Sequence, residues 1–198
     1  MLIGAGFDSF ALRRPAFSEG LEIFEIDHPA TQALKLQRIR ECGIALPPSV
    51  HFIAADLASE TLAAVLARSA FRESKPAFFS WLGVTVYLTR EANVATLRAI
   101  ASSSAAGSEL VFTYVDQIEF ASGGRRSLDN LDAQAVARMG EPYLSGFDPK
   151  EIANDLKAAG LDLVEDLDGD QMAERYGRTT GNPLRPPASS HIVLARRP

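Results

Sequence analysis

The sequence predicts an α/β domain in which helices cover both faces of a mostly parallel sheet, and three observations support this. Short apolar runs alternate with longer helical segments, which is typical of βαβ units. Most of the apolar runs are nearly continuous, as in parallel strands that are buried on both faces. The length of 198 residues suits one sizeable domain and is too short for two.

Seven apolar runs are predicted to be strands, and turn residues or helical segments separate them. They are Met1–Ile3, Leu21–Ile26, Val50–Ala54, Ala77–Leu82, Glu109–Val115, Leu161–Glu165 and His191–Ala195. Because glycines and prolines punctuate the stretch between the last two strands, we expect a long loop there.

Helical segments are predicted between these strands from their spacing of apolar residues. One begins near Asp8 or Ser9, and the others are Ala30–Cys42, Thr61–Ser69, Thr89–Ser104 and Pro149–Ala159. A glycine follows several of them, as is common where a helix ends.

Residues 117–146 interrupt the alternation of strands and helices. The stretch contains Gly123-Gly124-Arg125-Arg126, several acidic residues and few large apolar ones. We therefore expect a single domain over residues 1–198 with an insert or lid at about 117–146, partly helical near Ala133–Met139.

Composition narrows the classes of function. Hydrophobic residues make up 46% and charged residues 23%, the balance of a soluble globular protein. A formal net charge of −5 argues against a nucleic-acid partner, and no run is apolar enough to span a bilayer. The N-terminus lacks a signal-peptide pattern, and the lone Cys42 cannot form an internal disulfide, so a cytoplasmic location is expected. No cluster has metal-ligand spacing, and no metal is predicted.

A glycine-containing turn directly follows the first predicted strand. Glycine at Gly4 and Gly6 permits a positive φ and lets a ligand approach the backbone. The third glycine of the usual dinucleotide fingerprint is absent, since Leu12 and its neighbours occupy that region. The motif alone therefore leaves two interpretations open, a ligand cradle and a tight turn from strand to helix.

Carboxylates mark the ends of the next two strands. Asp27 lies about 20 residues after the glycines, where a carboxylate can accept hydrogen bonds from ribose hydroxyls. Asp56 follows the third strand, where it can bond an adenine amine while Leu57 covers the ring. Each acid has an alternative role as a helix N-cap. Taken in order, these strand ends predict an adenosyl cofactor along the carboxyl edge of the sheet.

Four segments together resemble the leucine carboxyl methyltransferase family, and most closely its bacterial branch. They are Leu2–Ser9, Phe24–Pro29, Ala55–Leu57 and Trp81–Leu88. The resemblance implies a class I methyltransferase, Rossmann-like fold with a seven-stranded sheet, in which strand seven runs antiparallel between strands five and six. It also implies the cofactor S-adenosylmethionine.

The resemblance also implies roles for individual residues. Gly4, Ala5 and Gly6 would lie against the methionine part of the cofactor. Asp27 would take the ribose, Asp56 and Leu57 would frame the adenine, and Leu82 would belong to the cofactor site from the fourth motif.

The sequence departs from the family pattern in two places. Family members that methylate a protein C-terminus carry a glutamate where Leu82 stands, so their substrate does not transfer to this sequence. The family also has a helical segment before the first strand, with an arginine that reaches the cofactor's carboxylate. Because this sequence begins at the strand, we expect it to be N-terminally short, with weak cofactor binding and an exposed apolar patch beside the first strand.

The functional prediction is an S-adenosylmethionine-dependent methyltransferase that methylates an oxygen, carboxyl or hydroxyl, of a small molecule. Tyr87 is the candidate on the substrate side, although an aromatic residue there also suits packing. A non-catalytic cofactor-binding remnant or interaction module is the main alternative, and nicotinamide-dependent oxidoreduction is a weaker one. A homodimer that covers the exposed patch is a further expectation.

Overall fold

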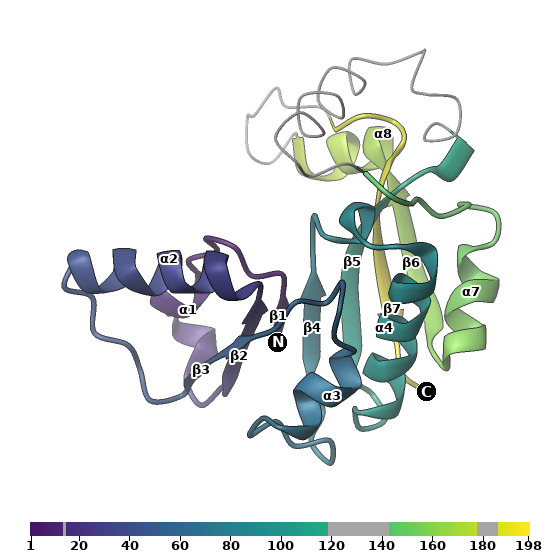
Figure 1. Ribbon diagram of the computed structural model, residues 1–198. Coiled ribbons are helices and arrows are strands. Elements are labelled where there is room, and N and C mark those ends of the chain that lie inside the picture. Colours follow the sequence, from purple (N-terminus) through teal and green to yellow (C-terminus); the bar gives the residue numbers. More distant parts are fainter. Residues whose placement is uncertain (14, 119–142, 178–185) are drawn as a thin grey trace.

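The computed structural model contains a seven-stranded sheet flanked by helices (Figure 1). It describes all residues except 14, 119–142 and 178–185. Most of the predicted insert, including the expected helix at Ala133–Met139, therefore lies outside the described residues. The strand order is β3-β2-β1-β4-β5-β7-β6.

The strand directions confirm the expected topology. Parallel ladders join β3, β2, β1, β4 and β5, and β7 pairs antiparallel with both β5 and β6. The sheet is therefore mostly parallel, with one reversed strand between β5 and β6. The strands are β1 Leu2–Ile3, β2 Ile23–Asp27, β3 Val50–Ala54, β4 Phe78–Trp81, β5 Glu109–Val115, β6 Asp162–Asp168 and β7 Ser190–Arg196.

The longer helices begin and end where the sequence supplies caps. The side chains of Thr61 and Thr89 accept backbone N–H bonds at the starts of two helices, and Gly160, at φ 91°, ends a third. The helices are α1 Phe10–Arg13, α2 Pro29–Glu41, α3 Leu62–Ala67, α4 Arg90–Ser102, α7 Ile152–Ala159 and α8 Gly169–Met172, with short turns at Ala16–Ser18, Thr85–Tyr87 and Ala173–Gly177.

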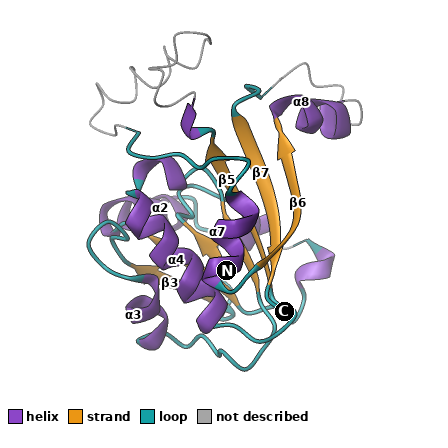
Figure 2. Cartoon of the chain, turned by 90° about the vertical axis from the view of Figure 1, so that its right-hand side faces the viewer, coloured by secondary structure: helices purple, strands orange, loops and turns teal. Residues whose placement is uncertain are grey.

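The two faces of the sheet are covered unequally. Helix α4 contacts both α3 and α7, and the three helices form a layer over one face. Figure 2 shows this layer on one side of β5, β7 and β6, whereas the other side of these strands carries little helix. Beneath the layer, Phe79, Trp81, Leu110 and Phe112 are fully buried. Burial of such side chains contributes roughly 1.5–3 kcal/mol each.

Two local predictions were wrong. The second strand was placed at Leu21–Ile26 but occupies Ile23–Asp27, because backbone pairing with β3 continues to Asp27 opposite Ala54. The stretch after β6 was expected to be loop but continues into α8. Its start is a capping box in which the Asp168 side chain accepts from the N–H of Gln171 and the Gln171 side chain accepts from the N–H of Asp168.

Candidate cofactor site

The predicted site residues come from four strands that are neighbours in the sheet. Strands β3, β2, β1 and β4 are consecutive and parallel, so the loops after them meet at one edge. Backbone bonds tie these loops together. Ile26 O accepts from Gly4 N at 2.8 Å, and Asp27 O accepts from Ala55 N at 2.9 Å.

The glycine turn after β1 is built from two glycines that serve different purposes. Gly4, at φ 68°, lies so close to Val84 that an added Cβ would stand 2.2 Å from Val84 Cγ2. A side chain at Gly4 would therefore push the turn away from the loop after β4. Gly6, at φ 48°, faces open space where a Cβ would meet nothing within 4 Å. Gly6 is thus the position at which a ligand can approach the backbone.

Asp27 closes the glycine turn from the neighbouring strand. Its Oδ2 accepts from Gly6 N–H, and its Oδ1 accepts from its neighbour's amide, His28 N, at 2.6 Å. The alternative role as helix N-cap is wrong, because His28 caps α2 through its Nδ1. A carboxylate has about four acceptor positions, so Asp27 retains acceptor capacity for ligand hydroxyls.

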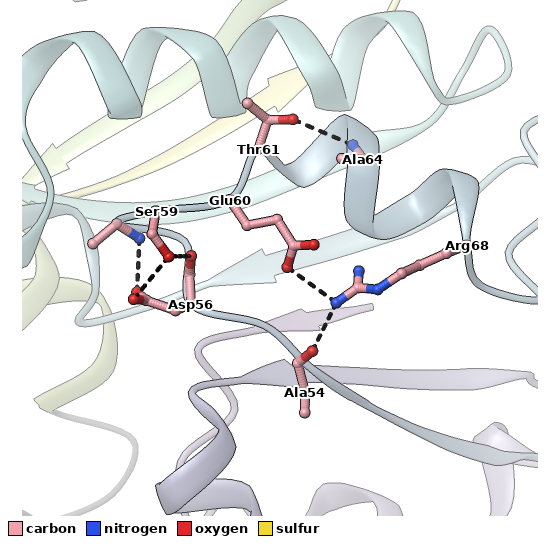
Figure 3. Close-up of polar contacts among 8 residues, drawn as sticks. Ala54, Asp56, Ser59, Glu60, Thr61, Ala64 and Arg68 are labelled. Carbon is pink, nitrogen blue, oxygen red and sulfur yellow. Dashed lines mark hydrogen bonds and ion pairs between the residues drawn. The ribbon is translucent and has the colours of Figure 1, made fainter.

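Asp56 organises the loop after β3, and Figure 3 shows its contacts. Its carboxylate accepts from Ala58 N at 3.0 Å and from Ser59 Oγ at 2.9 Å. It does not cap the following helix, since Thr61 does that at Ala64 N. Leu57, the predicted adenine neighbour, is half-buried and packs against the core. The structure thus gives Asp56 a turn-forming role and leaves its carboxylate partly exposed.

The loop after β4 completes the edge. Leu82 is 46% exposed, so its apolar side chain is accessible to a ligand at this edge. The loop is held from β5, because Gly83 N donates to Thr113 Oγ1 at 2.7 Å and Thr85 Oγ1 donates to Thr113 O at 2.7 Å.

Tyr87 lies at the far end of this loop, against a residue that sequence reasoning missed. Its ring meets Tyr143 edge-on, with ring centroids 5.5 Å apart. The segment that carries Tyr143 is fixed beside the loop, since Leu144 N donates to Val86 O and the buried Asn93 donates to Ser145 Oγ. No signal in the sequence indicates a pairing across 56 residues.

A separate hollow of about 540 Å³ runs along the outer edge strand β3. Among its lining residues, Arg68 is already engaged, because Nη2 donates to Ala54 O at 2.8 Å and to Glu60 Oε1 at 3.0 Å (Figure 3). The hollow contains none of the predicted site residues. We therefore assign the candidate site to the carboxyl edge.

In the described part of the chain, no group of three or more His, Cys, Asp or Glu side chains could hold a metal ion. Outside residues 14, 119–142 and 178–185, no helix combines the length and apolar character required to cross a membrane.

Comparison with known sequences decides the family. The model of the leucine carboxyl methyltransferase family matches residues 1–101. The chain belongs to this family. The matched half of the chain contains the four loops of the candidate site, from Gly4 to Tyr87.

Bacterial relatives extend the match beyond that half. "Putative S-adenosyl-L-methionine-dependent methyltransferase YktD" of Bacillus subtilis is 34% identical over 176 residues, which cover 89% of this chain and 58% of the relative. A protein of the same description from Mycobacteroides abscessus is 26% identical over 185 residues, covering 93% of this chain and 60% of the relative. The chain thus spans less than two thirds of these relatives' length.

Solved structures share the fold at low sequence identity. Magnesium protoporphyrin IX methyltransferase from Synechocystis, solved with bound SAH, has a TM-score of 0.56 and 14% identity over the whole of this chain and 72% of its own. The cyclase SpnF has a TM-score of 0.58 and 17% identity over the whole of this chain and 73% of its own. These likenesses confirm the class I methyltransferase fold. The fold alone does not decide the reaction, because one of the two is a cyclase.

Proposed function

We propose that this chain is the cofactor-binding core of an S-adenosylmethionine-dependent methyltransferase that methylates an oxygen of a small molecule. The main support is the arrangement of ligand-accessible groups along the carboxyl edge of the sheet. An open Gly6 backbone, the Asp27 carboxylate and the Asp56 loop lie at the ends of three adjacent parallel strands. Family membership and the names of the relatives support the same activity.

The residues at this edge fit an adenosyl cofactor in order along the sheet. In our proposal, Gly4, Ala5 and Gly6 lie against its methionine part. Asp27 accepts hydrogen bonds from the ribose, and Asp56 accepts one from the adenine amine. Leu57 and the exposed Leu82 supply apolar contacts.

For methyl transfer, the main contribution of the protein is to position the acceptor oxygen relative to the methyl group. When bound, the cofactor supplies an electrophilic methyl group on a positively charged sulfur. The residues of the carboxyl edge would hold the cofactor so that this methyl group faces the acceptor oxygen, and loss of the methyl group would leave a neutral thioether. Alignment of this kind contributes roughly 7–11 kcal/mol in well-oriented cases. Tyr87 and Tyr143 would orient the acceptor.

The nature of the acceptor oxygen sets the demand for a base. A carboxylate oxygen attacks without losing a proton, whereas a hydroxyl must release one to a neighbouring group. Incubation with methyl-labelled cofactor and a panel of carboxylic acids and phenols tests the proposal. Label in an O-methyl product supports it. Binding of S-adenosylhomocysteine without transfer to any acceptor would instead favour a non-catalytic cofactor-binding module.

The Asp27→Ala variant tests the ribose assignment. We expect its affinity for S-adenosylhomocysteine in calorimetry to fall at least about tenfold, because a charge-assisted hydrogen bond contributes roughly 1.5–3 kcal/mol. Asp162→Ala is the matched control, since this exposed carboxylate begins β6 at the opposite edge of the sheet. Equal affinities of the two variants would place the ribose elsewhere.

A further inference from the structure

A buried ion pair lies directly behind the candidate ribose carboxylate. Lys35 Nζ of α2 lies 2.5 Å from Glu25 Oε2 of β2, and the two side chains are 5% and 1% exposed. Gln32, one turn before Lys35, donates to the backbone O of Glu25 at 3.4 Å. One face of α2 therefore holds the strand two residues before Asp27.

Stability does not explain this pair well. A buried ion pair is often no more stabilising than apolar side chains of similar size, because both charges lose their hydration. Moreover, Glu25 Oε1 is buried and has no hydrogen-bond partner among the residues that the structure describes. An unpartnered buried oxygen is destabilising, and more so when it is charged. The arrangement is therefore a candidate for a functional role.

The surroundings of Glu25 oppose its negative charge. Burial raises the pKa of Glu25, and the carboxylates of Asp8 and Asp27 raise it further. Only Lys35 acts in the other direction, by hydrogen bond and by charge. Asp8 follows the glycine turn, and Asp27 lies on the same face of β2 as Glu25. Three carboxylates thus gather beside the turn, with Lys35 as the cation that Glu25 contacts.

We propose that Lys35 and Glu25 form a positioning pair that keeps the Asp27 carboxylate directed at the glycine turn and available to the ribose. The proposal rests on the function proposed above. Ionised Glu25 has no proton to donate, so the Asp27 carboxylate keeps the N–H groups of Gly6 and His28 as its donors, as in the structure. If Glu25 takes a proton, its O–H becomes a donor to Asp27 and competes with Gly6 and the ribose. Lys35 prevents this by holding Glu25 ionised.

Calorimetry with S-adenosylhomocysteine tests the pair through the pH dependence of affinity. In Lys35→Met, we expect affinity about tenfold below the unaltered chain at pH 7, and this deficit should shrink as the pH is raised and Glu25 loses its proton. Lys35→Arg keeps the cation and should stay within about threefold at every pH. Glu25→Met/Lys35→Met removes the competing donor and should lose the extra pH dependence.

Amide hydrogen exchange at Gly6 without any cofactor gives a second, independent readout. The Gly6 N–H bonds Asp27, so Lys35→Met should speed its exchange several-fold, while the double variant and Lys35→Arg should not. Unchanged Gly6 exchange in Lys35→Met overturns the positioning pair, as does a loss of affinity that is the same at every pH or persists in the double variant. Failure of the unaltered chain to bind S-adenosylhomocysteine overturns the proposed function instead, and the exchange data still decide the pair. If Lys35→Met does not fold, the other two variants are compared. Faster exchange of the Gly6 amide in the double variant than in Lys35→Arg then also overturns the positioning pair.

Discussion

The two faces of the sheet differ sharply in burial at strands β4, β5 and β7, although the same strands form both faces. On the face beneath α3, α4 and α7, Phe79, Trp81 and Phe112 are fully buried. On the opposite face, Phe78 is 52% and Leu82 46% exposed, and residues of β5 such as Val111 are only half-buried. Parallel strands normally have both faces covered.

This difference separates what holds the fold from what is free to bind. The covered face supplies the packed core, whereas the open face continues into the edge that carries Leu82 and the glycine turn. Phe7, Phe78 and Leu82 are exposed one by one, and the apolar patch expected beside the first strand stays a prediction. Stability should therefore respond to changes on one face and much less to changes on the other.

The largest effect is expected for Phe112→Ala. This side chain is fully buried and packs against the rings of Trp81, Tyr114 and Phe147. Its truncation should lower the free energy of unfolding in urea by roughly 3–5 kcal/mol. The matched change Val111→Ala, on the other face of the same strand, should cost below about 1 kcal/mol. Similar losses in both variants would remove the difference between the faces.

A smaller effect is expected for hydroxyl groups at the next two positions. Tyr114 OH donates to Asp166 at 2.7 Å, and burial, with Asp166 beside it, raises the pKa of Tyr114 well above its usual range. Tyr114→Phe should therefore destabilise by roughly 1–3 kcal/mol at all pH values up to 9, measured in urea.

On the open face, Thr113→Val is compared with Tyr114→Phe. The substitution removes the hydroxyl that accepts from Gly83 N, and water can take its place because this hydrogen bond is exposed. We expect a loss of roughly 0.5–1 kcal/mol. A larger loss in Thr113→Val than in Tyr114→Phe would contradict the assignment of the faces.

The smallest effect on stability is expected for Phe78→Ser. Because Phe78 is half-exposed at the start of β4, the free energy of unfolding should change by less than about 0.5 kcal/mol. Binding of an apolar fluorescent dye to the folded chain should fall, since the substitution shrinks the exposed apolar surface. Strong destabilisation would mean that another copy or segment covers this face in solution.

The sequence predicted some elements to the residue and others only approximately, for physical reasons. Strands Val50–Ala54 and Glu109–Val115 were correct because apolar residues fill them and turn residues bound them. The second strand was misplaced, because its last residue, Asp27, is polar and is held by pairing with Ala54. A polar strand end that faces a site does not show in an apolar pattern.

Candidate residues were easier to predict than their partners. Glycines and acids after strands are visible along the chain, so Gly6, Asp27 and Asp56 could be named as candidates from the sequence. The clash that requires Gly4 arises from Val84, 80 positions away, and the Glu25–Lys35 pair forms only when α2 lies on β2. Such contacts depend on tertiary packing, which periodicity and spacing do not encode.

Amide resonances of the ¹⁵N-labelled chain can show directly whether the carboxyl edge of β3, β2, β1 and β4 binds an adenosyl cofactor. S-adenosylhomocysteine would be titrated into the labelled chain while these resonances are followed by NMR. We predict saturable shifts at Gly6, His28 and Ala58, with little change at Glu109 and Asp162 on the opposite edge. Shifts confined to the hollow along β3, or no saturable shift at Gly6, would contradict it.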